Sequence, residues 1–192
     1  MRYLFLQLAG FSAILACLCA TQVLAGERPH NDAVTAILKL ADNLNAKDAG
    51  QTARTIVRDH DGCDISQIFR PRSRGGAGVG SIATTPGANS IDHLVRRWAS
   101  DKPPTAEQLK KHQTDLLKMA RVLQAMAELA PHRMPMYPKG DKRIEEWPKV
   151  THDFKIHTRD LREGIEALDA DRVRATAVKL ENTCNRCHTI AF

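Results

Sequence analysis

The chain has 192 residues and a formal net charge of +6 at pH 7, and 43% of its residues are hydrophobic. A basic surface attracts acidic partners. Nucleic acid is a poor candidate, because the basic residues are spread through segments that also carry Asp and Glu, and aromatic residues make up only 5% of the chain. The length suits one well-buried domain.

Residues 1–25 predict a secretory signal. Arg2 gives a positive start, an apolar run extends from Tyr3 to Cys19, and Val23-Leu24-Ala25 resembles a cleavage site. The run is shorter than the ~20 residues that favour a membrane span, although an uncleaved anchor stays an alternative. The mature chain, 26–192, is then one exported domain with no stable membrane span of its own.

Helical periodicity dominates the rest of the chain, which predicts an all-α fold. The first stripe ends near Leu44, and Asn45 is a candidate N-cap for a second helix that runs to about Arg58. Residues 61–90 are rich in Gly, Pro and Arg and predict a long irregular insertion, in which the glycine run 75–80 fits no phosphate-binding motif. A short helix over 91–98 follows.

Three longer helices are expected after this gap. The first spans about 105–130 and ends at Pro131, and the second spans about 142–168, with Pro148 near its start. A tight Asp169-Ala170-Asp171 connection begins the last helix. Its apolar stripe continues into two cysteines near the C-terminus, so whatever these cysteines hold is expected to pack into the interior of the bundle.

The last helix ends in Cys184-Asn185-Arg186-Cys187-His188, the Cys-x-x-Cys-His pattern of c-type haem attachment. Positions i, i+3 and i+4 share one helix face, so Cys184 and Cys187 can form thioether bonds while His188 reaches the iron as an axial ligand. A thioredoxin-like dithiol would follow a strand, and a structural zinc site would need two further ligands. One covalent haem c is therefore predicted, with disulfide and zinc kept as alternatives.

Two further sets of residues are candidates for contacts with this haem. The guanidinium groups of Arg70, Arg72 and Arg74 suit pairing with the propionates, although a flexible connection is the favoured interpretation of their loop. Met119 is the first choice for a sixth iron ligand, against the simpler interpretation of a core methionine. The other candidates for that position are Met126, Met134, His112 and His132.

The pattern over 142–192 resembles the class II c-type cytochromes, the cytochrome c-prime group, which carry Cys-x-x-Cys-His on the last helix of a four-helix bundle. The resemblance implies a haem-binding electron carrier of the bacterial periplasm. The net charge of +6 favours redox partner proteins with acidic surfaces, and no enzyme is expected because no distal acid or base residue can be identified. Members of this group often form dimers, so a homodimer stays open. The alternative function is a five-coordinate haem protein that binds nitric oxide or another small gas.

Overall fold

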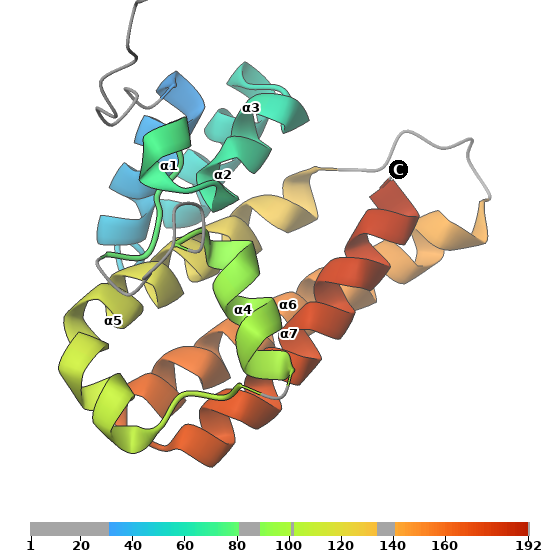
Figure 1. Ribbon diagram of the computed structural model, residues 1–192. Coiled ribbons are helices and arrows are strands. Elements are labelled where there is room, and N and C mark those ends of the chain that lie inside the picture. Colours follow the sequence, from blue (N-terminus) through green and yellow to red (C-terminus); the bar gives the residue numbers. More distant parts are fainter. Residues whose placement is uncertain (1–30, 81–88, 101, 134–140, 192) are drawn as a thin grey trace, which may run out of the picture.

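The computed structural model describes residues 31–80, 89–100, 102–133 and 141–191 (Figure 1). All of the regular structure in these ranges is helical, which confirms the all-α, bundle-like fold. The predicted signal segment, 1–25, lies outside the described residues. The α-helices are α1 (Asp32–Asp42), α2 (Ala49–Asp59), α3 (Gly62–Ser66), α4 (Ile91–Ala99), α5 (Ala106–Leu129), α6 (Lys142–Glu166) and α7 (Ala170–Ala191).

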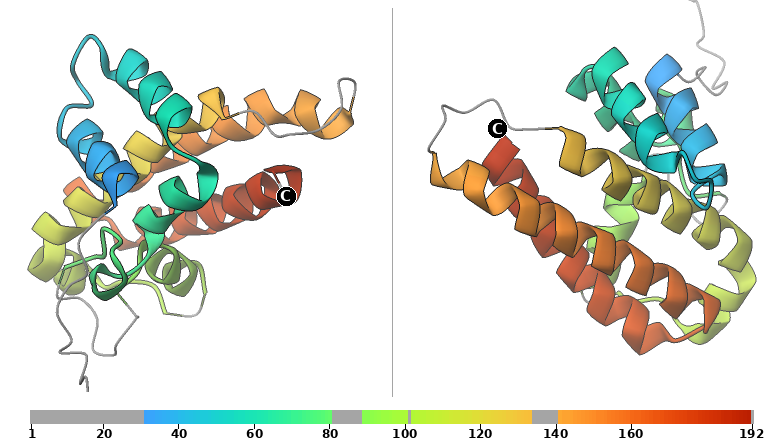
Figure 2. Two further views of the ribbon diagram at one scale, coloured as in Figure 1. Left: turned by 90° about the horizontal axis from the view of Figure 1, so that it is seen from above. Right: turned by 180° about the vertical axis from the view of Figure 1, so that it is seen from behind.

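Three long helices, α5, α6 and α7, form the body of the molecule. Helix α6 packs against α5 on one side and against α7 on the other. The short helix α4 lies across α7, whereas α1 and α2 pack against α5 (Figures 1 and 2). The C-terminal helix therefore has two described neighbours of substantial contact, α6 and α4.

Helices α6 and α7 form an antiparallel hairpin joined by a tight turn, as the sequence predicted (Figure 2). Leu168 adopts a left-handed conformation with a φ of 55°. The carboxylate of Asp169 then accepts a hydrogen bond of 2.9 Å from the backbone N–H of Arg172, which caps the start of α7. This turn sets the register that places the end of α7 beside the beginning of α6.

The apolar side chains form two separate clusters. The main core includes the stripes predicted for α1, α5 and the first half of α7, with Ile37, Met119 and Leu180 each at most 1% exposed. A second, smaller cluster consists of Trp147 and Val150 from α6 and Ile190 from α7. The far ends of α6 and α7 thus have a core of their own.

The described part of the expected insertion is only partly irregular, which corrects the sequence-based prediction for 61–80. It contains α3 and two 3-10 turns, η1 (Gln67–Phe69) and η2 (Arg72–Arg74), and α3 and η1 pack against α1. The glycine-rich run is largely buried. The backbone N–H of Ala77 donates to the carbonyl of Ile68 at 3.0 Å. Glycine is used here for close packing and for turns, because Gly75, Gly78 and Gly80 have positive φ.

Of two smaller predictions about helix ends, the first was wrong. Asn45 does not cap α2, since the residue before that helix is Asp48, and Asp48 makes no side-chain capping bond. Pro148 lies more than one turn inside α6, where it has no N–H to donate to the carbonyl of Ile144. Helix α6 nevertheless continues through it as one element.

Helix α5 begins with a capping box, which gives a direct test of its N-terminus. The Thr105 hydroxyl accepts from the N–H of Gln108 at 3.2 Å, and the Gln108 side chain accepts from the N–H of Thr105 at 3.0 Å. Thr105→Ala should lower the free energy of unfolding by about 1 kcal/mol in urea titrations. Thr114→Ala, at an exposed position inside the same helix, is the control and should cost nothing. Equal losses in the two variants would contradict the cap.

Candidate haem-attachment site

The Cys-x-x-Cys-His segment lies in the last two turns of α7, on a helix that extends past the main core. Cys184 and Cys187 are half-buried, whereas His188 is exposed. The two cysteines lie one turn apart and continue the face on which Val173, Ala177 and Leu180 are buried. The structure therefore presents both thiols on the inward side of the helix.

The two thiols have different surroundings. Cys187 packs against the small cluster of Trp147, Val150 and Ile190. Cys184 lies within electrostatic reach of Asp92 and Arg96 from α4, the helix that crosses α7. These neighbours could not be predicted from the sequence, because the crossing of α4 over α7 has no signal in the local pattern of either helix.

Burial raises the pKa of both thiols to about 11. For Cys184 the nearby Cys187 adds to the increase, and the positive charge of Arg96 opposes it. Dithiol oxidoreductases instead depend on a cysteine whose pKa is lowered, since the thiolate is the attacking species. The raised pKa values of this Cys-x-x-Cys pair thus disfavour redox dithiol chemistry.

Ion pairs and one histidine fix this part of α7 against α6. Arg186, inside the motif, pairs with Asp153 at 3.3 Å and with Glu146 at 3.7 Å. The Thr183 hydroxyl donates to the carbonyl of Lys179 at 2.8 Å, so it accepts from Nδ1 of His157 at 3.0 Å. Burial lowers the pKa of this imidazole, which favours its neutral form as a hydrogen-bond partner inside the hairpin.

The arginines proposed for the propionates lie in a different part of the fold. Arg72 uses its Nε to donate to the carbonyl of Ala77 at 3.0 Å, within its own loop. Arg70 and Arg74 are exposed beside η1 and η2, and η1 packs against α1. These positions give the three arginines no described contact with the motif, and Arg96 is the arginine that the fold brings near Cys184.

Met119 also lies apart from the motif. It is 1% exposed and belongs to the main core, on a helix that packs against α6, α1 and α2. Cys187 belongs to the smaller cluster. This burial favours the interpretation of Met119 as a core side chain. Met134 lies outside the described residues, while Met126 is partly buried at the edge of the main core.

The motif supplies two thiols and one imidazole, the groups that a covalent haem would use. Within the described ranges, no three His, Cys, Asp or Glu side chains come together closely enough to hold a metal ion, and a structural zinc site needs four such ligands. A covalent haem would need fewer protein ligands than a zinc ion, because its thioether bonds form at the edge of the macrocycle and its iron lies at the centre. Two thiols and one imidazole on neighbouring turns are sufficient.

No family model, no curated protein and no solved structure matches this chain. The candidate site therefore rests on the residues of this chain alone. None of the helices in the described part of the chain is long and apolar enough to cross a bilayer.

The raised pKa values of the thiols predict low reactivity in the haem-free chain. At near-neutral pH, iodoacetamide should modify the exposed Cys63 well before Cys184 or Cys187. The rate at the two buried thiols should increase about tenfold per pH unit until the pH approaches their pKa. Peptide mass spectrometry would follow each site, with the urea-unfolded chain as the control. Faster modification of Cys184 than of Cys63 at neutral pH would instead identify an activated dithiol.

Proposed function

We propose that this protein is an exported mono-haem c-type cytochrome that carries electrons between redox partners. The observation that supports this best is the inward-facing pair Cys184 and Cys187, followed by His188, on the last helix of an all-α bundle. In this proposal the two cysteines hold the macrocycle and His188 is the axial ligand. The haem, when bound, supplies a one-electron couple at its iron.

The residues of the chain would orient the haem and limit its contact with water. Arg186 and its two carboxylate partners hold the motif in register with α6. The cluster around Trp147 covers one side of Cys187, and α4 crosses α7 near Cys184. A haem that is partly shielded in this way keeps an exposed edge for electron exchange.

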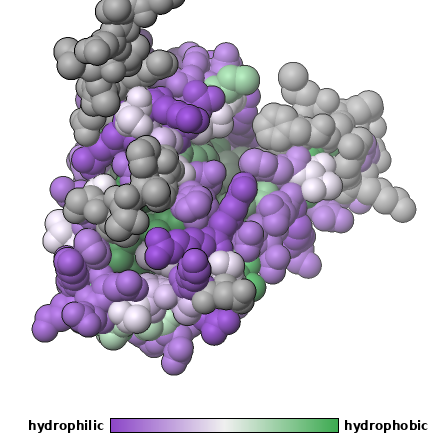
Figure 3. Space-filling view, in the orientation of Figure 1, coloured by the Kyte–Doolittle hydropathy of each residue, from purple (hydrophilic) through white to green (hydrophobic). Residues whose placement is uncertain are grey.

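The molecular surface over α4 and α7 suits transient docking. The face shown in Figure 3 is mainly hydrophilic, with hydrophobic residues visible between the polar ones. Arg96 and Arg97 are exposed on α4. Together with the net charge of +6, this supports partners with acidic surfaces, which increase the rate of encounter through electrostatic steering.

The deciding experiment is chemical analysis of the cofactor in the purified mature protein. The pyridine haemochrome spectrum should be that of a c-type haem, and the intact mass should show one haem added to the polypeptide. Export would be tested by finding the mature protein, without residues 1–25, in the periplasmic fraction. An unmodified polypeptide mass from cells competent in c-haem maturation would overturn the proposal.

The second candidate function is binding of a small gas at an open iron position. The burial of Met119 in the main core favours it, because this places the first-choice sixth ligand in a different cluster from Cys187. A methionine ligand would raise the reduction potential and favour electron transfer, whereas an open position would admit nitric oxide or carbon monoxide.

Carbon monoxide binding to the reduced protein separates these two functions. We expect Met119→Ala to bind carbon monoxide at the wild-type rate and to lose about 2–5 kcal/mol of stability, as a large-to-small core substitution does. Slow binding in both proteins would indicate another sixth ligand and support electron transfer. Rapid binding in both would support the gas-binding function, and rapid binding in Met119→Ala alone would identify Met119 as the ligand.

A further inference from the structure

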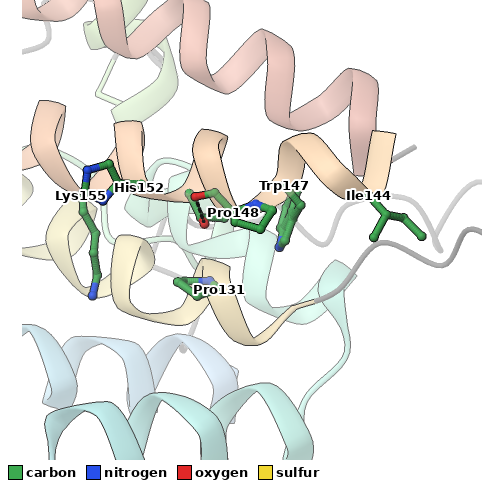
Figure 4. A pocket seen from close by; sticks show the side chains of 7 residues that line it. Pro131, Ile144, Trp147, Pro148, His152 and Lys155 are labelled. Carbon is green, nitrogen blue, oxygen red and sulfur yellow. Dashed lines mark hydrogen bonds between the residues drawn. The ribbon is translucent and has the colours of Figure 1, made fainter. Parts of the chain in front are cut away.

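A groove of about 380 Å³ lies between α6 and the 3-10 turn η3 (Ala130–His132) that follows α5 (Figure 4). Its size is in the range of small-molecule sites. The walls are largely apolar, with Pro131 on one side and Ile144 and Pro148 on the other. The groove opens on the η3 side of α6 (Figure 4), and Trp147, which lines it, also belongs to the small cluster against which Cys187 packs.

One polar group in the wall of the groove lacks a partner. Trp147 is 5% exposed, and its indole N–H makes no hydrogen bond with any residue that the structure describes. Figure 4 shows the indole extending from α6 toward η3, with its nitrogen at the far end. A buried donor without an acceptor destabilises the folded protein. An acceptor that enters the groove would remove this destabilisation.

The charges around the groove favour an anion. Lys155 and His152 contribute to its lining. Lys155 pairs with Glu128 at 2.8 Å, but an ammonium has three donors and can bind a second acceptor. The pKa of the nearby His132 is lowered by burial first and then by the positive charges of Arg54 and Lys155. Lys155 and His152 are thus the groups in the lining that can meet an anion, although Glu145 and Glu146 lie beside Trp147 on the same helix.

We propose that this groove binds a small aromatic carboxylate. Its ring system lies against Pro131 and Ile144, and its carboxylate accepts the N–H of Trp147. Lys155, about two turns further along α6, contributes a positive charge at a distance from this carboxylate. Because Trp147 also packs in the cluster beside Cys187, the tests below measure probe binding directly and do not use haem content as their readout.

The experiment uses the indole signals of the ¹⁵N-labelled mature protein, which has two tryptophans. Trp147→Phe identifies the signal of Trp147, and the other signal belongs to Trp98, which is buried in the main core. The probe is naphthalene-2-carboxylate. The Trp147 signal should move with a saturable dependence on probe concentration while the Trp98 signal stays in place. No saturable shift, or equal shifts of both signals, would overturn the proposal.

Two variants test the parts of the site separately by calorimetry. Trp147→Phe keeps an aromatic ring against Val150 and Ile190 and removes only the donor, so it should weaken probe binding about fivefold. Trp98→Phe is the matched control and should bind as wild type does. Lys155→Met should weaken binding of the carboxylate but not of naphthalene-2-carboxamide. Wild-type affinity in Trp147→Phe would exclude the hydrogen bond, and an equal loss for both probes in Lys155→Met would exclude the charge.

Discussion

The double variant Cys184→Ala/Cys187→Ala should contain no covalently bound haem when it is exported from cells that mature c-type cytochromes. The haem is expected to attach only through these two thiols, and both are half-buried on the inner face of α7. The intact mass should equal that of the polypeptide alone, and haem staining after denaturing electrophoresis should disappear. This is the largest effect that the proposed function predicts, because it removes the cofactor altogether.

Two controls make this result specific to the motif. Cys63→Ala removes an exposed cysteine on α3 and should keep a full complement of haem. His188→Ala should keep the thioether-bound haem but change its absorption spectrum and lower its thermal stability, since the axial bond fixes the iron to the chain. Covalent haem in the double variant would contradict the assignment. An unchanged spectrum in His188→Ala would mean that another residue binds the iron.

Gly76→Ala should be the most destabilising single-methyl substitution in the segment 61–80. A Cβ at this position would lie 2.0 Å from the carbonyl oxygen of Arg70, which is backbone and cannot move aside as a side chain could. We expect a loss of at least about 2 kcal/mol in the free energy of unfolding, at the level of other overpacked sites. Urea unfolding followed by circular dichroism would measure it.

Gly50→Ala is the matched control for this prediction. Gly50 lies in α2, and a Cβ there would meet no atom within 4 Å. The substitution should therefore stabilise the protein by about 0.5–1 kcal/mol through helix propensity. If Gly76→Ala proved as harmless as Gly50→Ala, the packed description of the segment 61–80 would be wrong.

The long helices could be predicted from sequence because each of them buries one regular stripe. Leu116, Met119 and Leu123 on α5 are all at most 3% exposed, as the spacing of three and four indicated. The glycine run was misread for a physical reason. Glycine signals both a flexible linker and a tightly packed turn, and only the neighbours of Gly76 reveal which of the two applies.

The candidate site was predictable in its chemistry but not in its surroundings. The motif itself is local, so Cys184, Cys187 and His188 could be chosen from their spacing alone. The division of the interior into two clusters depends on where α5 diverges from the hairpin of α6 and α7, and Arg96 approaches Cys184 only because α4 crosses α7. Such tertiary contacts produce no periodic pattern in the sequence. For this reason the sequence pointed to Arg70, Arg72 and Arg74 as candidates for the haem propionates, and not to Arg96.

The small cluster at the end of the α6–α7 hairpin has a consequence for how the protein matures. A helix end whose described apolar contacts come from the small cluster of Trp147, Val150 and Ile190 can open in a local fluctuation while the main core remains folded. The attachment machinery would then reach Cys187 without a globally unfolded substrate. In the proposed cytochrome, haem attachment would make the last two turns of α7 resistant to hydrogen exchange. Exchange protection at the C-terminus of α7 would then distinguish protein with attached haem from protein without it.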